Sequence, residues 1–229
     1  MKQIGCSVFA AMFTGFLAHA TILPPTGSAP VAPGVFGTPA TGPFLANTGF
    51  EPFTGTNSLG QTTISGEYEA MVYSDPKNTF CAGCLDFFII VDNNSSSTDS
   101  IERITLASFG DLSTDVGYTI GKGGNPTGAA PISVTRSSNG TTVGFNFSTL
   151  AGVAPGKDTE VLEIETDATS FVQGSLQIID SSVASVEAFA PASVPEASSI
   201  SLTLLGGALL GIGLIGRRRR MAGCSKASD

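Results

Sequence analysis

The feature that most constrains this chain is a stretch of seventeen uncharged residues, 200–216, which four arginines follow directly: Arg217, Arg218, Arg219 and Arg220. As a helix this stretch is about 25 Å long, close to the roughly 30 Å hydrocarbon core of a bilayer. Arginines placed directly after a membrane span favour leaving that end in the cytoplasm. The sequence therefore predicts a single C-terminal transmembrane helix, a short cytoplasmic tail over residues 221–229, and a body outside.

A short Pro-Glu element precedes this span, at Val194, Pro195 and Glu196. The order of Pro-Glu, Gly/Leu-rich span and Arg cluster, over residues 194–220, resembles the PEP-CTERM sorting signal of exported bacterial proteins. The resemblance implies that an exosortase-type membrane enzyme reads the Pro-Glu pair, removes the tail and delivers the product to the cell surface or an exopolysaccharide matrix. The next position, usually Pro in that family, is Ala197 here. A plain membrane anchor is the alternative that the same hydrophobicity supports.

The first residues of the chain, 1–20, have the three parts of a secretory signal peptide. Lys2 provides the positive start, residues 4–17 form the apolar centre, and Ala18 and Ala20 provide the small-x-small cleavage site. The apolar part is short for a membrane span, which favours a cleaved signal over an uncleaved anchor. The sequence therefore predicts that the chain from residue 21 onward is exported.

The predicted exported body is acidic and contains no histidine. Residues 21–190 carry five basic and seventeen acidic side chains, a net charge of minus twelve, and the single histidine, His19, lies in the predicted signal peptide. This charge disfavours nucleic acid as a partner. The lack of histidine excludes Ser-His-Asp and Cys-His catalysis and zinc sites that contain histidine. We therefore expect a binding or structural module without a cofactor rather than an enzyme.

Composition divides the body into two parts. Residues 21–56 are rich in Pro and Gly and are expected to form an extended arm over the body or a partly disordered linker. Residues 57–190 consist of short β-type runs separated by turn residues, with no amphipathic helical period. Such a pattern predicts an all-β domain, an antiparallel β-sandwich.

Four segments of this domain carry the clearest strand signals. The apolar run 85–91 predicts a central strand buried on both faces. Asn139-Gly140 predicts a hairpin between flanking strands, and residues 180–182 predict a second one. Alternation over residues 161–166 predicts a strand with one buried face and one solvent-facing face.

Cys81 and Cys84 form the one local motif of the body, Cys-Ala-Gly-Cys. The segment that follows reads as a strand rather than a helix, which argues against a thioredoxin-like redox site. A zinc site would need two further ligands, and the body offers neither histidine nor another cysteine. In an oxidising compartment the expected state is a structural disulfide, with a redox site and a reduced pair as alternatives.

Two groups of polar side chains are candidates for cation binding or catalysis: first Asp92, Asn93, Asn94 and Asp99, and second Glu160, Glu163, Glu165 and Asp167. The first group offers oxygen ligands for Ca²⁺ but lacks the spacing of an EF-hand. The second contains an alternating pair, yet nothing in the sequence places a partner acid opposite it. We therefore expect a solvated loop and a solvated strand face, with no metal site.

These observations predict an exported structural or adhesive protein of the cell surface or extracellular matrix, held in the inner membrane until its tail is processed. The expected partners are the processing enzyme, the membrane through residues 200–216, and an exopolysaccharide. Two other functions stay open: a permanently anchored extracytoplasmic ligand-binding protein and a secreted carboxylate-dependent hydrolase.

Overall fold

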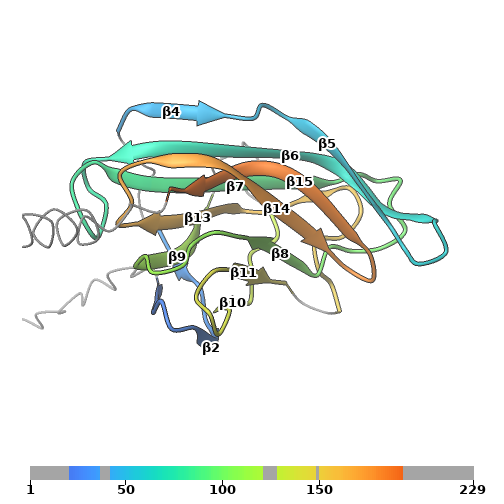
Figure 1. The fold of residues 1–229 in the computed structure, drawn as a ribbon. Helices are drawn as coiled ribbons and strands as arrows, with labels where there is room; N and C mark the ends of the chain where they lie inside the picture. The colour runs from blue at the N-terminus through green and yellow to red at the C-terminus, as the bar shows by residue number, and fades with distance from the viewer. Residues whose placement is uncertain (1–20, 37–41, 121–127, 148–149, 193–229) are drawn as a thin grey trace, which may run out of the picture. The chain divides into compact units, whose positions relative to one another are not determined.

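The computed structural model describes residues 21–36, 42–120, 128–147 and 150–192. No residue in these ranges lies in a helix, and the strands form one largely antiparallel sheet (Figure 1). The prediction of an all-β body with antiparallel pairing is therefore confirmed. The predicted signal peptide and the predicted sorting signal lie outside the described residues.

The segment expected as an arm or linker contributes the first five strands: β1 (Thr21–Leu23), β2 (Ser28–Val31), β3 (Gly34–Val35), β4 (Phe44–Asn47) and β5 (Glu51–Thr56). The others are β6 (Thr62–Asp75), β7 (Cys84–Asn93), β8 (Arg103–Leu106), β9 (Thr114–Thr119), β10 (Ser133–Arg136), β11 (Val143–Asn146), β12 (Lys157–Asp158), β13 (Val161–Thr166), β14 (Phe171–Ile179) and β15 (Val183–Pro191).

Hydrogen-bonded neighbours follow the order β1-β9-β13-β7-β6-β5-β15-β14-β8-β11-β10-β2. Strand β3 runs parallel to β9, whereas β4 and β12 pair antiparallel with β6 and β7. The pair Val183–Thr56 joins β15 to β5 and so connects the two halves of the path. Buried apolar side chains from both halves belong to one hydrophobic cluster, including Phe87 of β7 and Phe145 of β11. Burial of this apolar surface is the main driving force for the fold.

Three predicted elements are confirmed by the strand pairing. The apolar run 85–91 lies in β7, between β6 and β13. The residues of β7 from Cys84 to Ile89 are all buried. Strands β10 and β11 pair around Asn139-Gly140, and Gly140 has the positive φ of 73° that such a turn requires. Strands β14 and β15 form the second hairpin over nine register pairs.

The buried side chain of Arg136 connects the two ends of the strand order. Its Nη1 donates to the carbonyl oxygen of Leu23 in β1 at 2.8 Å and to Oγ1 of Thr114 in β9 at 3.2 Å. Its Nε donates to the carbonyl oxygen of Gly140 at 2.8 Å, and its Nη2 donates to that of Phe109. Burial lowers the pKa of Arg136, whereas Asp167 and Asp111 raise it. The guanidinium therefore satisfies backbone acceptors that the strand ladders leave open.

The arm also supplies aromatic contacts across β6 and β7. The rings of Phe44 in β4 and Tyr73 in β6 meet edge to face at 5.3 Å, and Tyr73 meets Phe88 of β7 in the same way at 5.3 Å. Tyr73 and Phe88 lie on the face of these strands opposite to Val72 and Phe87, which belong to the hydrophobic cluster. Part of this second face is therefore covered as well.

Candidate functional site

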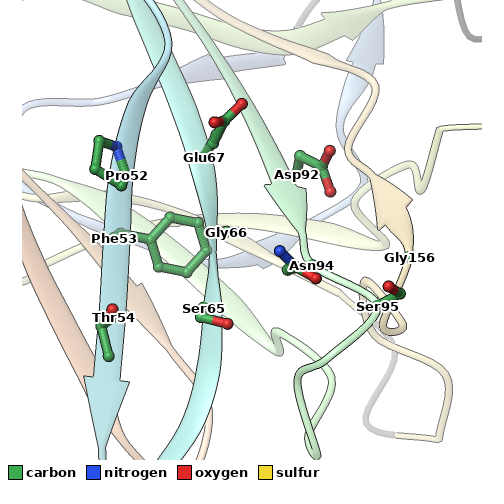
Figure 2. A pocket seen from close by; sticks show the side chains of 10 residues that line it. All are labelled: Pro52, Phe53, Thr54, Ser65, Gly66, Glu67, Asp92, Asn94, Ser95 and Gly156. Carbon is green, nitrogen blue, oxygen red and sulfur yellow. The ribbon is translucent and has the colours of Figure 1, made fainter.

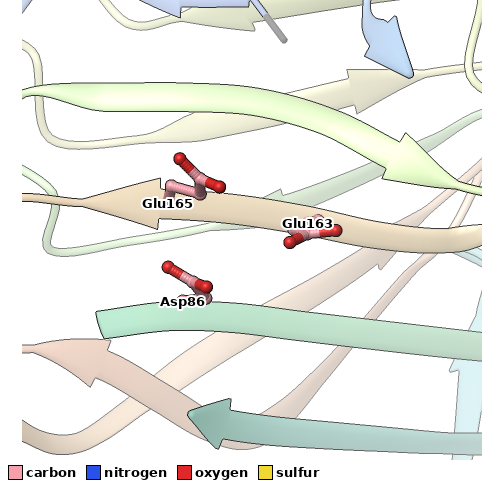
Figure 3. Close-up of side chains that lie close together, drawn as sticks. All are labelled: Asp86, Glu163 and Glu165. Carbon is pink, nitrogen blue, oxygen red and sulfur yellow. The ribbon is translucent and has the colours of Figure 1, made fainter. Parts of the chain in front are cut away.

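Three carboxylates lie together on the second face of two neighbouring strands. Asp86 of β7 pairs directly with Glu165 of β13, and Glu163 lies two residues before it on the same face. One oxygen from each carboxylate lies within 4.8 Å of one from each of the others, and all three side chains are buried (Figure 3). Asp86 is 0% exposed, Glu163 1% and Glu165 7%. We call these three residues the carboxylate cluster.

Each carboxylate of the cluster has one oxygen held by a hydrogen bond from the protein. Asn78 Nδ2 donates to Asp86 Oδ1 at 2.7 Å, and Thr119 Oγ1 donates to Glu163 Oε2 at 2.6 Å. The backbone N–H of Thr79 donates to Glu165 Oε2 at 2.9 Å. These bonds fix the orientation of the acids, while Asp86 Oδ2 is buried without a hydrogen-bond partner.

Burial has the largest effect on the pKa of Asp86. Loss of hydration raises the pKa of Asp86 to about 8; the Asn78 hydrogen bond opposes this rise, and the charges of Glu165, Glu163 and Asp75 add to it. On the other side of β13, Asp115 of β9 lies directly opposite Glu165. Like charges at directly opposed positions destabilise a sheet, so this arrangement is costly unless a proton or a cation compensates it.

The loop from residue 76 to residue 83 brings Asn78 and Thr79 to the cluster, and a disulfide lies at its end. Cys81 and Cys84 are bonded to each other, as predicted. Asn78 Oδ1 accepts from the backbone N–H of Phe80 at 2.8 Å, and Asn78 Nδ2 also donates to the carbonyl oxygen of Thr166 at 3.1 Å. The backbone N–H of Cys81 also donates to Asn78 Oδ1 at 3.4 Å, so the Cys-Ala-Gly-Cys motif contacts the residue that holds Asp86.

The prediction of a solvated face on residues 161–166 is wrong. All six residues of β13 are buried, and Glu160 is only 7% exposed. Asp167, the fourth acid of this predicted group, is exposed. Its Oδ1 accepts a hydrogen bond from the backbone N–H of Ser113 at 3.1 Å. Asp86 is the partner acid of Glu165, and the sequence analysis did not identify it. The one sign of it in the sequence is that Asp86 is a charged residue inside an otherwise apolar run.

The predicted group of Asp92, Asn93, Asn94 and Asp99 does not converge on one point. Asp92 and Asn94 are exposed, whereas Asn93 between them is 0% exposed and turns the other way. Asn93 Nδ2 donates to the carbonyl oxygens of Val153 at 2.7 Å and Asp99 at 3.0 Å. The loop is therefore partly built into the body, and its four side chains do not form one ligand set.

A hollow of about 600 Å³ lies beside this loop, between β5, β6 and the end of β7 (Figure 2). The polar side chains on its wall include Thr54, Ser65, Glu67 and Asp92. Partial loss of hydration raises the pKa of Asp92, and the charges of Asp158 and Glu67 add to the effect. Both Glu67 and Asp92 are exposed, so the hollow is an open acidic groove rather than an enclosed site.

The structure does not describe the predicted sorting and cleavage residues. The Pro-Glu element, the arginine cluster and the signal cleavage site all lie outside the described residues. Within the described ranges, no helix is long and apolar enough to cross a membrane.

Comparisons with known proteins found no match, whether to a family model, to a curated protein or to a solved structure.

Proposed function

We propose that the protein is exported, sorted through its C-terminal signal and deployed at the cell surface or in the extracellular matrix, where an antiparallel β-sandwich body acts as a structural or adhesive module. One observation carries the proposal: the order of the Pro-Glu element, the uncharged span 200–216 and the arginine cluster. In this proposal an exosortase-type enzyme reads Pro195 and Glu196, and an exopolysaccharide is the partner in the matrix.

The disulfide between Cys81 and Cys84 supports the exported location, because disulfides persist in oxidising compartments and are rare in the cytosol. The composition of the body supports a structural role, because the segment 21–190 contains no histidine to act as a general base or a metal ligand. The first observation agrees with delivery to the outside, and the second agrees with a body that has a structural role.

A carboxylate-dependent hydrolase is less well supported by the geometry. Glycoside hydrolases place two carboxyl groups about 5 to 9.5 Å apart on either side of a bound substrate. The acids of the carboxylate cluster approach one another more closely and have almost no contact with solvent. A sugar ring has no access to such a group, which favours a module without catalytic activity.

One observation favours the permanently anchored ligand-binding protein as a second candidate. The acidic groove beside Asp92 is open to solvent and could accept a hydroxyl-rich or cationic ligand. In that case the chain would keep its C-terminal span and remain in the membrane.

The intact mass of the protein recovered from surface and medium fractions distinguishes these candidates. We expect loss of residues 1–20 and of everything after about Glu196, with the mass of the oxidised Cys81–Cys84 pair. Replacing Pro195 and Glu196 together by Ala should leave the unprocessed chain in the membrane, while Glu187→Ala in the body should change nothing. Recovery of the wild-type chain with Arg217 to Asp229 still attached would refute processing and leave the anchored protein.

A further inference from the structure

We propose that Asp86, Glu163 and Glu165 bind one divalent cation of the oxygen-preferring class, with Ca²⁺ as the favoured ion. The site belongs to the folded body and does not depend on the C-terminal signal or on where the protein is delivered. Its test is therefore independent of the test of the proposed function.

The spacing of the three acids suits a single ion. Ca²⁺ binds carboxylate oxygens at about 2.3–2.6 Å, so two oxygens on the same ion can be at most about 5 Å apart. In the carboxylate cluster the three candidate oxygens lie within 4.8 Å of one another. One ion can therefore contact all three carboxylates without a change in the strand register that pairs Asp86 with Glu165.

An independent observation points to a ligand at this place. Asp86 Oδ2 is buried and accepts no hydrogen bond, although Asp86 is 0% exposed. Figure 3 shows the Asp86 carboxylate turned from β7 toward the two glutamates of β13. Buried polar atoms in folded proteins nearly always have a partner, and a cation shared with the two glutamates would supply one for this oxygen.

The hydrogen bonds around the cluster are those expected of ligands held in place. Asn78, Thr119 and the backbone of Thr79 each hold one oxygen of a different carboxylate. Hydrogen bonds of this kind orient the ligands of metal sites and contribute to metal affinity. The site is thus shaped in advance by two separate segments of the chain, the loop that contains Asn78 and Thr79 and strand β9.

The donor set determines the class of ion. The cluster offers carboxylate oxygens alone, which suit Ca²⁺, Mg²⁺ and Mn²⁺ rather than ions that prefer nitrogen or sulfur. Mg²⁺ gives up its water reluctantly, and the near-complete burial of the acids leaves little room for bound water. Ca²⁺ accepts irregular coordination and is therefore the favoured ion.

The test uses the full chain in detergent, stripped of metal with EDTA, desalted, and titrated with CaCl₂ alone by calorimetry. We expect one Ca²⁺ per chain and a higher unfolding temperature in the presence of Ca²⁺. The variants Asp86→Asn and Glu165→Gln should each weaken Ca²⁺ binding by at least about 10-fold. The control Asp92→Asn, the same change at an exposed position on the same strand, should stay within about 2-fold of wild type.

Asp86→Asn is the decisive variant, because it keeps an acceptor for Asn78 and replaces one ligand oxygen of the carboxylate by an amide nitrogen. Its metal-free form should fold and unfold at a temperature no lower than that of the wild type. Lack of Ca²⁺ binding by the wild-type chain, or equal binding by Asp86→Asn, would overturn the proposal. Tighter binding of Mg²⁺ than of Ca²⁺ would overturn the assignment of the ion.

Discussion

Asp86 and Glu165 lie directly opposite each other on neighbouring strands, and both are withdrawn from solvent. In water the two carboxylates of such a pair would repel each other weakly. Inside a protein their repulsion is much stronger, and removing their charges from water costs additional free energy. The pair therefore needs a proton or a metal ion to be stable, and its state links the stability of the fold to the solution around it.

We predict that the metal-free protein becomes less stable as the pH rises. The pKa of Asp86 lies near 8 in the folded chain and near 3.8 in the unfolded chain, so the folded chain holds the additional proton between these values. The free energy of unfolding should then fall by up to about 1.4 kcal/mol per pH unit across this window. Glu163, Glu165 and Asp75 are the charged groups that face Asp86.

Urea unfolding in EDTA at a series of pH values, followed by circular dichroism, measures this slope. Asp86→Asn should flatten it, whereas Asp92→Asn should leave most of it. A wild-type stability that rises between pH 5 and pH 7 would contradict the assignment to Asp86.

Removing the disulfide should weaken both the fold and the cluster. Its small ring contributes about 2 kcal/mol on the loop-entropy estimate, so Cys81→Ser with Cys84→Ser should lower the free energy of unfolding by about that amount. The double variant should also bind Ca²⁺ more weakly, because Asn78 and Thr79 lie in the segment next to the disulfide. Reductant should reproduce both effects in the wild type and change nothing in the double variant.

Arg136→Met should be strongly destabilising. The change keeps much of the apolar stem but removes the donors to the carbonyl oxygens of Leu23, Phe109 and Gly140. Buried acceptors that lose a charged donor cost about 1–3 kcal/mol each, so a total loss of at least about 3 kcal/mol is expected in urea unfolding. The control Lys157→Met, at an exposed position, should stay within about 0.5 kcal/mol of wild type. A loss of under 1 kcal/mol for Arg136→Met would mean that water replaces the guanidinium.

Alanine substitutions at two glycines should distinguish the cost of backbone strain from the cost of a steric clash. Gly140 and Gly60 both have positive φ, at 73° and 75°. A Cβ at Gly140 would lie 1.8 Å from the carbonyl oxygen of Pro25, whereas a Cβ at Gly60 would meet nothing within 4 Å. Gly60→Ala should therefore cost about 1 kcal/mol, from strain alone, and Gly140→Ala at least about twice as much. Equal losses in thermal or urea unfolding would show that the β1–β2 turn moves aside freely.

The local patterns in the sequence were sufficient to predict the strands with strong signals. The apolar run in β7, the Asn139-Gly140 turn and the β14–β15 hairpin each depend on neighbouring residues, and each is confirmed. The strands of the N-terminal segment were not predicted, because its Pro and Gly content is typical of a linker. These short strands form only by pairing with strands that are distant in the sequence. Strand β9 was missed because its residues become buried only through pairing with the distant strands β13 and β1.

The carboxylate cluster could not be predicted, because it depends on strand register. The alternation in β13 correctly separates Glu163 and Glu165 from Leu162 and Ile164, but it does not say what covers the acidic side. That side is buried because β7 brings Asp86 alongside and the loop after β6 brings Asn78 over it. No local pattern contains this information, since the residues lie some eighty positions apart in the chain.

The position of β1 and β2 at the two ends of the strand order has a consequence for the timing of folding. These strands are the first of the described residues to be synthesised, yet Thr21 pairs with Val116, and Ser28 pairs with Arg136. A chain that emerges N-terminus first must therefore leave β1 and β2 unpaired until about half of its 229 residues have been synthesised. The two halves of the strand order are joined later still, because the pair Val183–Thr56 can form only when nearly all of the described residues have been synthesised.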